Sequence, residues 1–488
     1  MQSIRLWVMT ALLAAGVQAE DKRPNVLLVL ADDLGYGDLA CYGNTEVQTP
    51  ELDAFAASGL KLTQCYASHP NCSPSRAGLM TGRTPTRLGI RDWIPEQSPA
   101  HLKREEVTVA TLLHRAGYRT CLSGKWHLNG WFNDPRQPQP NDHGFDHWFA
   151  TQNNAYPNHH NPVNFVRNGE KLGLLEGYAA DLVADEAIHW LREGRDSEQP
   201  FFLYVAFHEP HEPIATAPKY ASLYPNPDPA YSAHHGNITQ MDAAFGRLMR
   251  ALEELGAVEN TLVVFTSDNG PAITAMHPYG SSGPLRDKKG SMWEGGIRVP
   301  GIMRWPGRIK PGSTSDEPVC GVDFLPSMCD LLNLPLPAGR ALDGASFLPV
   351  WTGEKIHRQV PLYWQFNRAS GGPKVAVRQG DWKLVAALDR PPNDRETGFS
   401  EAIQNDVKES ELVDFQLYNL ANDIAENSDR ASRDPEVMER LQALMLPRYR
   451  EVRAETVVWP DWVNPGVEGP QIQWPDYVLE KRKKKTTK

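Results

Sequence analysis

Three short apolar runs, each followed at once by charged or amide side chains, constrain the fold of this chain more than any other feature. They span residues 25–30, 200–207 and 261–267. Continuous apolar runs of this length are typical of strands that are buried on both faces of a parallel sheet. In an open α/β sheet, ligands bind at the carboxyl ends of the strands. The runs therefore predict an α/β fold with a polar site along one edge of its sheet.

Oxygen-bearing side chains follow two of these runs. Asp32 and Asp33 come after the first run, and Asp268 and Asn269 come after the third. Adjacent carboxylates at the end of a buried strand are costly unless a cation or hydrogen-bond donors compensate for them. An all-oxygen set without cysteine suits calcium or magnesium rather than zinc. A solvated turn is the alternative for either segment alone, but two strand ends with the same chemistry favour a metal site.

The segments between the runs predict helices and two further strands, one of which begins at Tyr118 and ends in Gly124-Lys125-Trp126-His127-Leu128. The predicted helices cover residues 50–58, 75–81, 107–116 and 235–256, and the other predicted strand covers 60–67. This strand would deliver the residues that follow it to the same sheet edge. A helix N-terminus at residue 75 would direct partial positive charge and free amides toward an anion bound there.

The length and charge of the chain limit the class of protein. Its 488 residues suggest one large α/β domain, predicted at 20–335, and a smaller one at 336–470. A hydrophobic content of 41% and a charged content of 23% are those of a soluble globular protein. The net charge of −10 argues against general nucleic-acid binding, so we expect no nucleic-acid partner.

The C-terminal third has a different composition from the rest. Residues 374–378 and 382–387 predict an antiparallel pair of strands, and 434–453 predict a helix that is broken near Pro447. These elements indicate a small α/β subdomain. The last segment, 471–488, ends in a basic run, which we expect to be a disordered tail.

Residues 1–19 have the pattern of a signal peptide. Arg5 supplies the charged start, residues 6–17 are largely apolar, and Val17-Gln18-Ala19 is a small-residue cleavage pattern. The apolar run is shorter than the roughly 20 residues that span a bilayer, which favours removal over a membrane anchor. We therefore expect an exported protein, periplasmic or secreted, with no transmembrane anchor after cleavage.

Cys72 differs from an ordinary buried cysteine in its surroundings. It is one of six cysteines and stands among small polar residues, in the order Cys-x-Pro-x-Arg closed by Thr-Gly-Arg. The other five show neither a zinc pattern nor a dense disulfide framework. A pair between Cys320 and Cys329 stays open on sequence alone.

The segment around Cys72 resembles the signature of type I sulfatases, the formylglycine-dependent members of the alkaline-phosphatase-like superfamily. Further motifs of that family follow in the expected order over roughly residues 24–390: Gly124-Lys125-Trp126-His127-Leu128, Pro210-His211-Glu212-Pro213, and Lys289-Gly290 before Glu294-Gly295-Gly296. Lys288 stands where the family more often has glycine. The resemblance implies a large mixed, mostly parallel sheet sandwiched by helices, with a small C-terminal α/β subdomain that has an antiparallel sheet.

The resemblance also implies catalytic roles. Cys72 would be converted to formylglycine by a formylglycine-generating or sulfatase-maturing enzyme, and its hydrate would attack sulfur. Arg76 would support the modified residue. Lys125 and Lys289 would neutralise charge on the transferring sulfuryl group. His211, alone or with Lys289, would protonate the departing alcohol.

Two further roles complete this implied mechanism. His127 would deprotonate the second hydroxyl of the hydrate, which expels sulfate. A divalent cation, calcium or else magnesium, would polarise the sulfate oxygens. Its implied ligands are Asp32, Asp33, Asp268 and Asn269.

A sulfated sugar is the substrate that the resemblance favours. Residues 161–170 resemble the same region of glycan-desulfating members, and the irregular run 129–172 is rich in Asn, His and aromatic side chains. The predicted function is hydrolysis of a galactose or N-acetylgalactosamine 4- or 6-sulfate in a glycosaminoglycan or algal glycan. The predicted sugar contacts are His208, Asn154, His159, His160, Trp364, Gln365 and Arg378.

Two other functions remain open. A phosphatase or phosphonate monoester hydrolase of the same superfamily could use similar metal ligands. A non-catalytic glycan-binding relative is disfavoured, because every polar residue that the motifs require is present.

Overall fold

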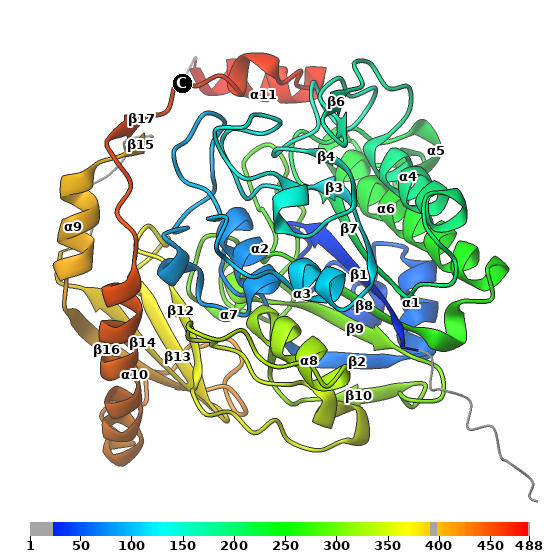
Figure 1. Ribbon diagram of the computed structural model, residues 1–488. Coiled ribbons are helices and arrows are strands. Elements are labelled where there is room, and N and C mark those ends of the chain that lie inside the picture. Colours follow the sequence, from blue (N-terminus) through cyan, green and yellow to red (C-terminus); the bar gives the residue numbers. More distant parts are fainter. Residues whose placement is uncertain (1–22, 391–397, 487–488) are drawn as a thin grey trace, which may run out of the picture.

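The computed structural model describes residues 23–390 and 398–486, which form a large sheet flanked by helices and a separate small sheet (Figure 1). The large sheet has eleven strands in the order β10-β2-β9-β8-β1-β7-β3-β4-β5-β6, with β11 beside β2. Its strands are β1 (Asn25–Asp32), β2 (Leu60–Tyr66), β3 (Arg119–Lys125), β4 (His147–Thr151), β5 (Val166–Arg167), β6 (Glu170–Lys171), β7 (Phe201–Pro210), β8 (Thr261–Ser267), β9 (Arg298–Arg304), β10 (Ser313–Ser315) and β11 (Val319–Cys320). Most pairings are parallel, while β9 is antiparallel to both of its neighbours. The predicted α/β class with a mixed, mostly parallel sheet is confirmed.

Four parallel strands at the centre of the large sheet end at the same edge. β1 pairs with β8 on one side and with β7 on the other, and β7 pairs in turn with β3. Apart from Asn25 and Arg119, every residue in these four strands is buried. This is the burial expected of parallel strands that are covered on both faces. Their C-terminal ends bring Asp32, Lys125 and the residues after Ser267 together.

Helices cover both faces of the large sheet. The alternation along β1 sends Leu27 and Val29 to one face and Val26 and Leu28 to the other. The first face is covered by α1 (Pro50–Ala57), α4 (Ala179–Glu193) and α6 (Pro229–Glu254), and the second by α2 (Cys72–Thr81), α3 (Val109–Arg115) and α8 (Phe324–Leu331). Two shorter helices, α5 (Pro218–Ala221) and α7 (Glu294–Ile297), lie in the connections. Each of the six covering helices buries apolar side chains against the sheet.

The small sheet is antiparallel and belongs to the C-terminal part of the chain. It contains β12 (Leu362–Gln365), β13 (Val375–Gln379), β14 (Trp382–Leu388) and β16 (Leu412–Asn419), in that order. α10 (Pro435–Glu455) packs on one face, and Tyr66 and Ile297 of the larger unit pack on the other. α9 (Glu401–Glu409) and the pair β15 (Gly398–Phe399) and β17 (Trp462–Val463) flank it. The antiparallel C-terminal sheet is as predicted.

The position of the domain boundary stays a prediction. β12 begins at Leu362, whereas Phe347 and Val350 still pack in the core of the large sheet. The predicted signal peptide, residues 1–19, lies outside the described residues. In the part of the chain that the structure covers, no helix combines the length and apolar character required to cross a membrane.

Two local predictions about the C-terminal part are corrected by the structure, and the open question of a Cys320–Cys329 pair is answered. α10 continues through Pro447, because Met445 and Tyr449 on either side are anchored in the core. Residues 476–486 form a helix, α11 (Asp476–Thr486), rather than a disordered tail, since Tyr477 and Lys481 are held by partners in the larger unit. Cys320 and Cys329, like the other four cysteines, are free thiols.

Candidate active site

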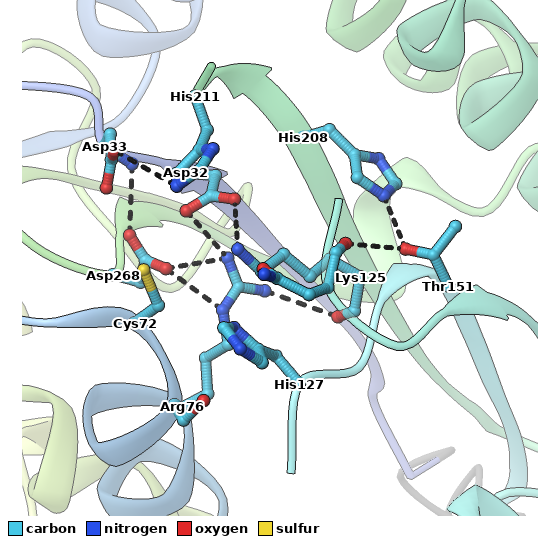
Figure 2. A network of polar contacts seen from close by, with 12 residues as sticks. Asp32, Asp33, Cys72, Arg76, Lys125, His127, Thr151, His208, His211 and Asp268 are labelled. Carbon is cyan, nitrogen blue, oxygen red and sulfur yellow. Dashed lines mark hydrogen bonds and ion pairs between the residues drawn. The ribbon is translucent and has the colours of Figure 1, made fainter. Parts of the chain in front are cut away.

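The carboxyl edge of the four central strands carries a cluster of buried charged residues (Figure 2). Asp32 ends β1, and Asp33 follows it with a φ of +66°, a left-handed conformation that Asp tolerates better than most residues. The amide of Asp33 donates to Asp268 Oδ1 at 3.1 Å, and Asn269 Nδ2 donates to Asp33 Oδ1 at 2.7 Å. The four predicted metal ligands thus come from two neighbouring strand ends and lie together.

Cys72 is the first residue of α2, not a residue before the helix as the sequence suggested. Asn71 caps the helix, because its side-chain oxygen accepts from the amide of Cys72 at 3.0 Å while its Nδ2 donates to Asp92 at 2.6 Å. Pro74 falls in the first turn, where its missing N–H costs no helical hydrogen bond. The helix therefore starts three residues earlier than predicted. This places Cys72 at the positive end of the helix dipole.

Lys289 connects Cys72 to the carboxylates. Its Nζ lies 3.2 Å from Cys72 Sγ and 2.6 Å from Asp33 Oδ1. The adjacent Lys288 donates instead to the backbone oxygen of Ile273. Burial raises the pKa of the Cys72 thiol to about 12, although Lys289 opposes this shift. The encoded thiol is therefore protonated at neutral pH, and a protonated thiol is a poor nucleophile.

Arg76 and Lys125 hold the carboxylates from the opposite side. The Arg76 guanidinium donates to Asp268 Oδ2 through Nε at 3.0 Å and Nη2 at 2.7 Å, and Lys125 Nζ donates to Asp32 Oδ2 at 2.7 Å. Arg76 also donates to the backbone oxygen of Lys125 at 3.3 Å. Both cations are fully buried. Buried charges are stable only when they are paired in this way.

The oxygen atoms of the cluster fit a metal ion. Asp32 Oδ1 and Asn269 Oδ1 are buried and have no hydrogen-bond partner within the described residues. Asp32 Oδ1 has one longer contact, an ion pair with Arg76 Nη2 at 3.5 Å. Buried oxygens without hydrogen bonds are costly unless a cation binds them. Ligand-capable atoms of Asp32, Asp33, Cys72 and His211 all lie within 4.8 Å of one another. The donor set is that of a hard divalent cation.

Two histidines complete the cluster. His211 follows β7, and its Nε2 lies 3.6 Å from Asp33 Oδ2. His127 follows β3 and has a φ of +56°, so the backbone is not extended at this residue. Its Nε2 lies 3.1 Å from the backbone oxygen of Ile94, while its buried Nδ1 has no partner among the described residues. Burial, reinforced by Lys125, lowers the pKa of His127, which keeps the imidazole neutral and able to accept a proton.

The sugar contacts predicted from the irregular run divide into two groups. His208 Nε2 pairs with Thr151 Oγ1 at 2.8 Å beside the cluster (Figure 2), and the buried His159 lies next to it at 6.1 Å between ring centroids. Asn154 is also nearly buried. His160 is exposed and stacks on Tyr178, so it faces another surface. Sugar binding by any of these four residues stays a prediction.

The three sugar contacts predicted in the C-terminal subdomain are not placed for that role. Trp364 is fully buried in the contact between the two units, and its indole N–H donates to the backbone oxygen of Ala67 at 2.8 Å. The guanidinium of Arg378 donates to Tyr66 and Gln64. Gln365 Oε1 accepts from Tyr363 at 2.8 Å. All three side chains are buried and hydrogen-bonded inside the protein, so the structure does not support their assignment as sugar contacts.

Sequence reasoning missed several residues of the site. Asn71 could have been found, because an Asn directly before a helix is a capping signal. Thr151, His277 and Tyr477 gave no signal, since each acts through a partner far away in the sequence: Tyr477 is 200 residues from His277.

Comparison with known proteins gives a consistent result. The sequence model of the family described as Sulfatase matches residues 24–334, and that of N-sulphoglucosamine sulphohydrolase, C-terminal, matches residues 285–396. Human arylsulfatase A (Homo sapiens) is 34% identical, with 94% of this chain and 94% of that protein covered. Rat N-acetylgalactosamine-6-sulfatase (Rattus norvegicus) is 30% identical, with 98% and 97% covered.

Solved structures extend the similarity to the fold. The crystal structure of Ps i-CgsB in complex with k-i-k-neocarrahexaose has a TM-score of 0.77 at 27% identity and covers 92% of this chain and 97% of that one. The phosphonate monoester hydrolase of Agrobacterium radiobacter, with a TM-score of 0.60 at 21% identity and a coverage of 89% and 96%, shares the fold. Together with the motifs assembled at the sheet edge, these matches show that the chain belongs to the type I sulfatases of the alkaline-phosphatase-like superfamily and is a sulfatase.

Proposed function

We propose that this enzyme hydrolyses the O-sulfate ester of a sulfated sugar, with a formylglycine made from Cys72 and with calcium. The observation that carries the proposal is the position of Cys72. It starts α2, lies 3.2 Å from Lys289 Nζ, and shares its surroundings with ligand-capable atoms of Asp32, Asp33 and His211. Three carboxylates face three cationic side chains, the fully buried Arg76 and Lys125 and the partly exposed Lys289, so the cluster is close to neutral. A bound divalent cation would therefore add net positive charge where a sulfate ester must bind.

The residues of the chain divide the chemistry among them. Formylglycine would supply a hydrated aldehyde as the nucleophile, and the cation, held by Asp32, Asp33, Asp268 and Asn269, would polarise the sulfate oxygens. Lys125 and Lys289 would stabilise charge on the sulfuryl group. His211 would hold the proton for the departing sugar oxygen, and the neutral His127 would take up a proton when sulfate is released.

The substrate class rests on the relatives. One solved relative is complexed with a neocarrahexaose, and curated relatives include N-acetylgalactosamine-6-sulfatases. These names support a galactose or N-acetylgalactosamine sulfate in a glycosaminoglycan or algal glycan. The predicted signal peptide would export the protein to the periplasm or the medium, where such glycans occur as substrates.

Mass spectrometry of the peptide that contains Cys72 tests the modification. Purified from its native host, the protein should carry the aldehyde at residue 72, and Cys72→Ala and Cys72→Ser should both lose turnover. Wild-type activity in either variant would overturn the assignment.

A panel of defined sulfated saccharides identifies the sugar. Sulfate and phosphate esters of one aryl alcohol, compared side by side, distinguish a sulfatase from a phosphatase of the same fold.

A further inference from the structure

The last helix of the chain is hydrogen-bonded to a loop beside the active site. α11 lies across the large unit, at the top of Figure 1, after the chain has passed through the C-terminal subdomain. Tyr477, in its first turn, pairs through its hydroxyl with His277 Nε2 at 2.9 Å. The two rings meet edge to face, with 5.8 Å between centroids. His277 itself is only 1% exposed.

His277 in turn fixes Glu212. His277 Nδ1 lies 2.7 Å from Glu212 Oε1, and Thr274 Oγ1 donates to the same oxygen at 2.6 Å. Because a carboxylate can only accept, Nδ1 carries the hydrogen of this bond. In the neutral imidazole, Nε2 is then the acceptor for the Tyr477 hydroxyl. Donors therefore run in one direction, from Tyr477 through His277 to Glu212.

Glu212 orients its neighbour His211. The backbone oxygen of Glu212 accepts from His211 Nδ1, and the His211 amide donates to the backbone oxygen of His208 at 2.9 Å. These two bonds direct His211 Nε2 toward the cluster, where it lies 3.6 Å from Asp33 Oδ2. The orientation of the His211 imidazole thus depends on the backbone of Glu212. His277 in turn fixes the side chain of Glu212.

We propose that Tyr477 and His277 are positioning residues that hold His211 in the geometry required to protonate the leaving group. The inference rests on the proposed function, in which His211 supplies this proton. A general acid must lie within hydrogen-bond reach of the atom that it protonates. Displacement by about 1 Å can cost on the order of 100-fold in rate. The C-terminal helix therefore completes the active site without touching the substrate.

Leaving-group dependence tests this role. A sugar alkoxide needs a proton to leave, whereas the 4-nitrophenolate of 4-nitrophenyl sulfate does not. Tyr477→Phe in the full-length enzyme should lower kcat for the sulfated sugar by about 5- to 20-fold, a fraction of the contribution of a general acid, and leave kcat for the aryl ester nearly unchanged. The ratio of the two kcat values does not depend on the fraction of active enzyme, so a loss of stability does not obscure the result.

Tyr279→Phe is the matched control. Its hydroxyl donates to Asp228 Oδ2 at 2.8 Å, and the same carboxylate also binds Lys481 of α11. This variant removes a hydroxyl near the same helix without touching His277, and the kcat ratio should stay at its wild-type value. His277→Asn breaks the connection one step closer to His211, so adding Tyr477→Phe to it should cause no further change.

Equal losses on both esters in Tyr477→Phe, or no loss on either, would overturn the inference. If the wild-type enzyme cleaves both esters and Tyr477→Phe has the wild-type ratio of the two kcat values, the inference is wrong and the proposed function stands. A wild-type enzyme with formylglycine at residue 72 that cleaves neither ester removes the proposed function, and the inference falls with it.

Discussion

Lys289 bridges the Cys72 sulfur and the Asp33 carboxylate, at 3.2 Å from the first and at 2.6 and 2.8 Å from the oxygens of the second. Its neighbour Lys288 bonds to the backbone oxygen of Ile273 instead. Lys289 therefore faces the Cys72 sulfur, whereas Lys288 is hydrogen-bonded to the loop that contains Ile273.

This pair gives the first prediction. Lys289→Ala should lower kcat by about 10²–10³-fold, as expected when a group that stabilises transition-state charge is removed. Lys288→Ala is the matched control and should retain most of the activity. Steady-state kinetics on one sulfate ester measures both. Equal losses in the two variants would contradict the assignment of Lys289.

Metal binding is predicted to stabilise the fold. Asp32 Oδ1 and Asn269 Oδ1 have no hydrogen-bond partner among the described residues, and both would bind the cation. Calcium added to chelator-treated protein at about 100 times its Kd should contribute about 2.7 kcal/mol to the free energy of unfolding and raise Tm. Activity should be lost on chelation and return with the ion.

Two carboxylate variants separate this effect from general stabilisation. Asp32→Asn should abolish the calcium-induced rise in Tm. Asp38→Asn should keep it, because Asp38 is a buried carboxylate outside the cluster that accepts from the backbone amides of Gly35 and Ser281. An unchanged calcium response in Asp32→Asn would exclude this site.

The cap of α2 is predicted to matter for both stability and activity. Asn71→Ala removes the bond to the Cys72 amide and should cost about 0.5–2 kcal/mol. Ser400→Ala removes a comparable cap on the remote α9, where Ser400 Oγ accepts from the Ile403 amide at 3.4 Å. Chemical denaturation should show losses in both, while kcat should fall only in Asn71→Ala. Loss of kcat in Ser400→Ala as well would point to a general effect of destabilisation.

Glu186 is predicted to make stability depend on acid pH. Burial alone would raise its pKa, but hydrogen bonds from His147 and Arg167 outweigh burial and lower it to about 2. Since the folded pKa lies below the unfolded value of about 4.5, this stabilisation is complete above pH 4.5 and is lost as the pH falls toward 2. Glu186→Gln should cost about 1–3 kcal/mol near neutral pH, discounted for the partly exposed Arg167, and less at pH 3.

Urea unfolding between pH 3 and 7 measures this difference. Glu193→Gln on the same helix is the control. Glu193 is exposed, and its ion pair with the exposed His189 is long, at 3.7 Å. Its effect should be small at every pH. A Glu186→Gln penalty that does not shrink toward pH 3 would show that packing, not charge, stabilises the wild type.

Much of the catalytic edge could be predicted from local pattern. Asp32 and Asp268 follow apolar runs, and such runs become buried parallel strands whose ends meet. Local pattern does not encode side-chain partners that are distant in sequence. The prediction of Trp364 as a sugar contact fails because the sequence alone does not distinguish an aromatic side chain in the core from one on the surface.

The C-terminal segment shows the same limit. Its basic composition predicted a disordered tail, but Tyr477 and Lys481 bond to His277 and Asp228, which no local pattern connects. Tertiary contacts also keep α10 helical through Pro447, although proline disfavours the interior of a helix.

The burial of Cys72 sets an order of events. Only 2% of its surface is accessible, and its sulfur lies behind Lys289 at the start of a helix whose every residue is buried. A second enzyme cannot bring its own catalytic groups to this atom without removing α2 from the core. We therefore expect the proposed conversion to formylglycine to precede the folding of residues 71–83, so that the chain would receive its nucleophile before it acquires the fold that uses it.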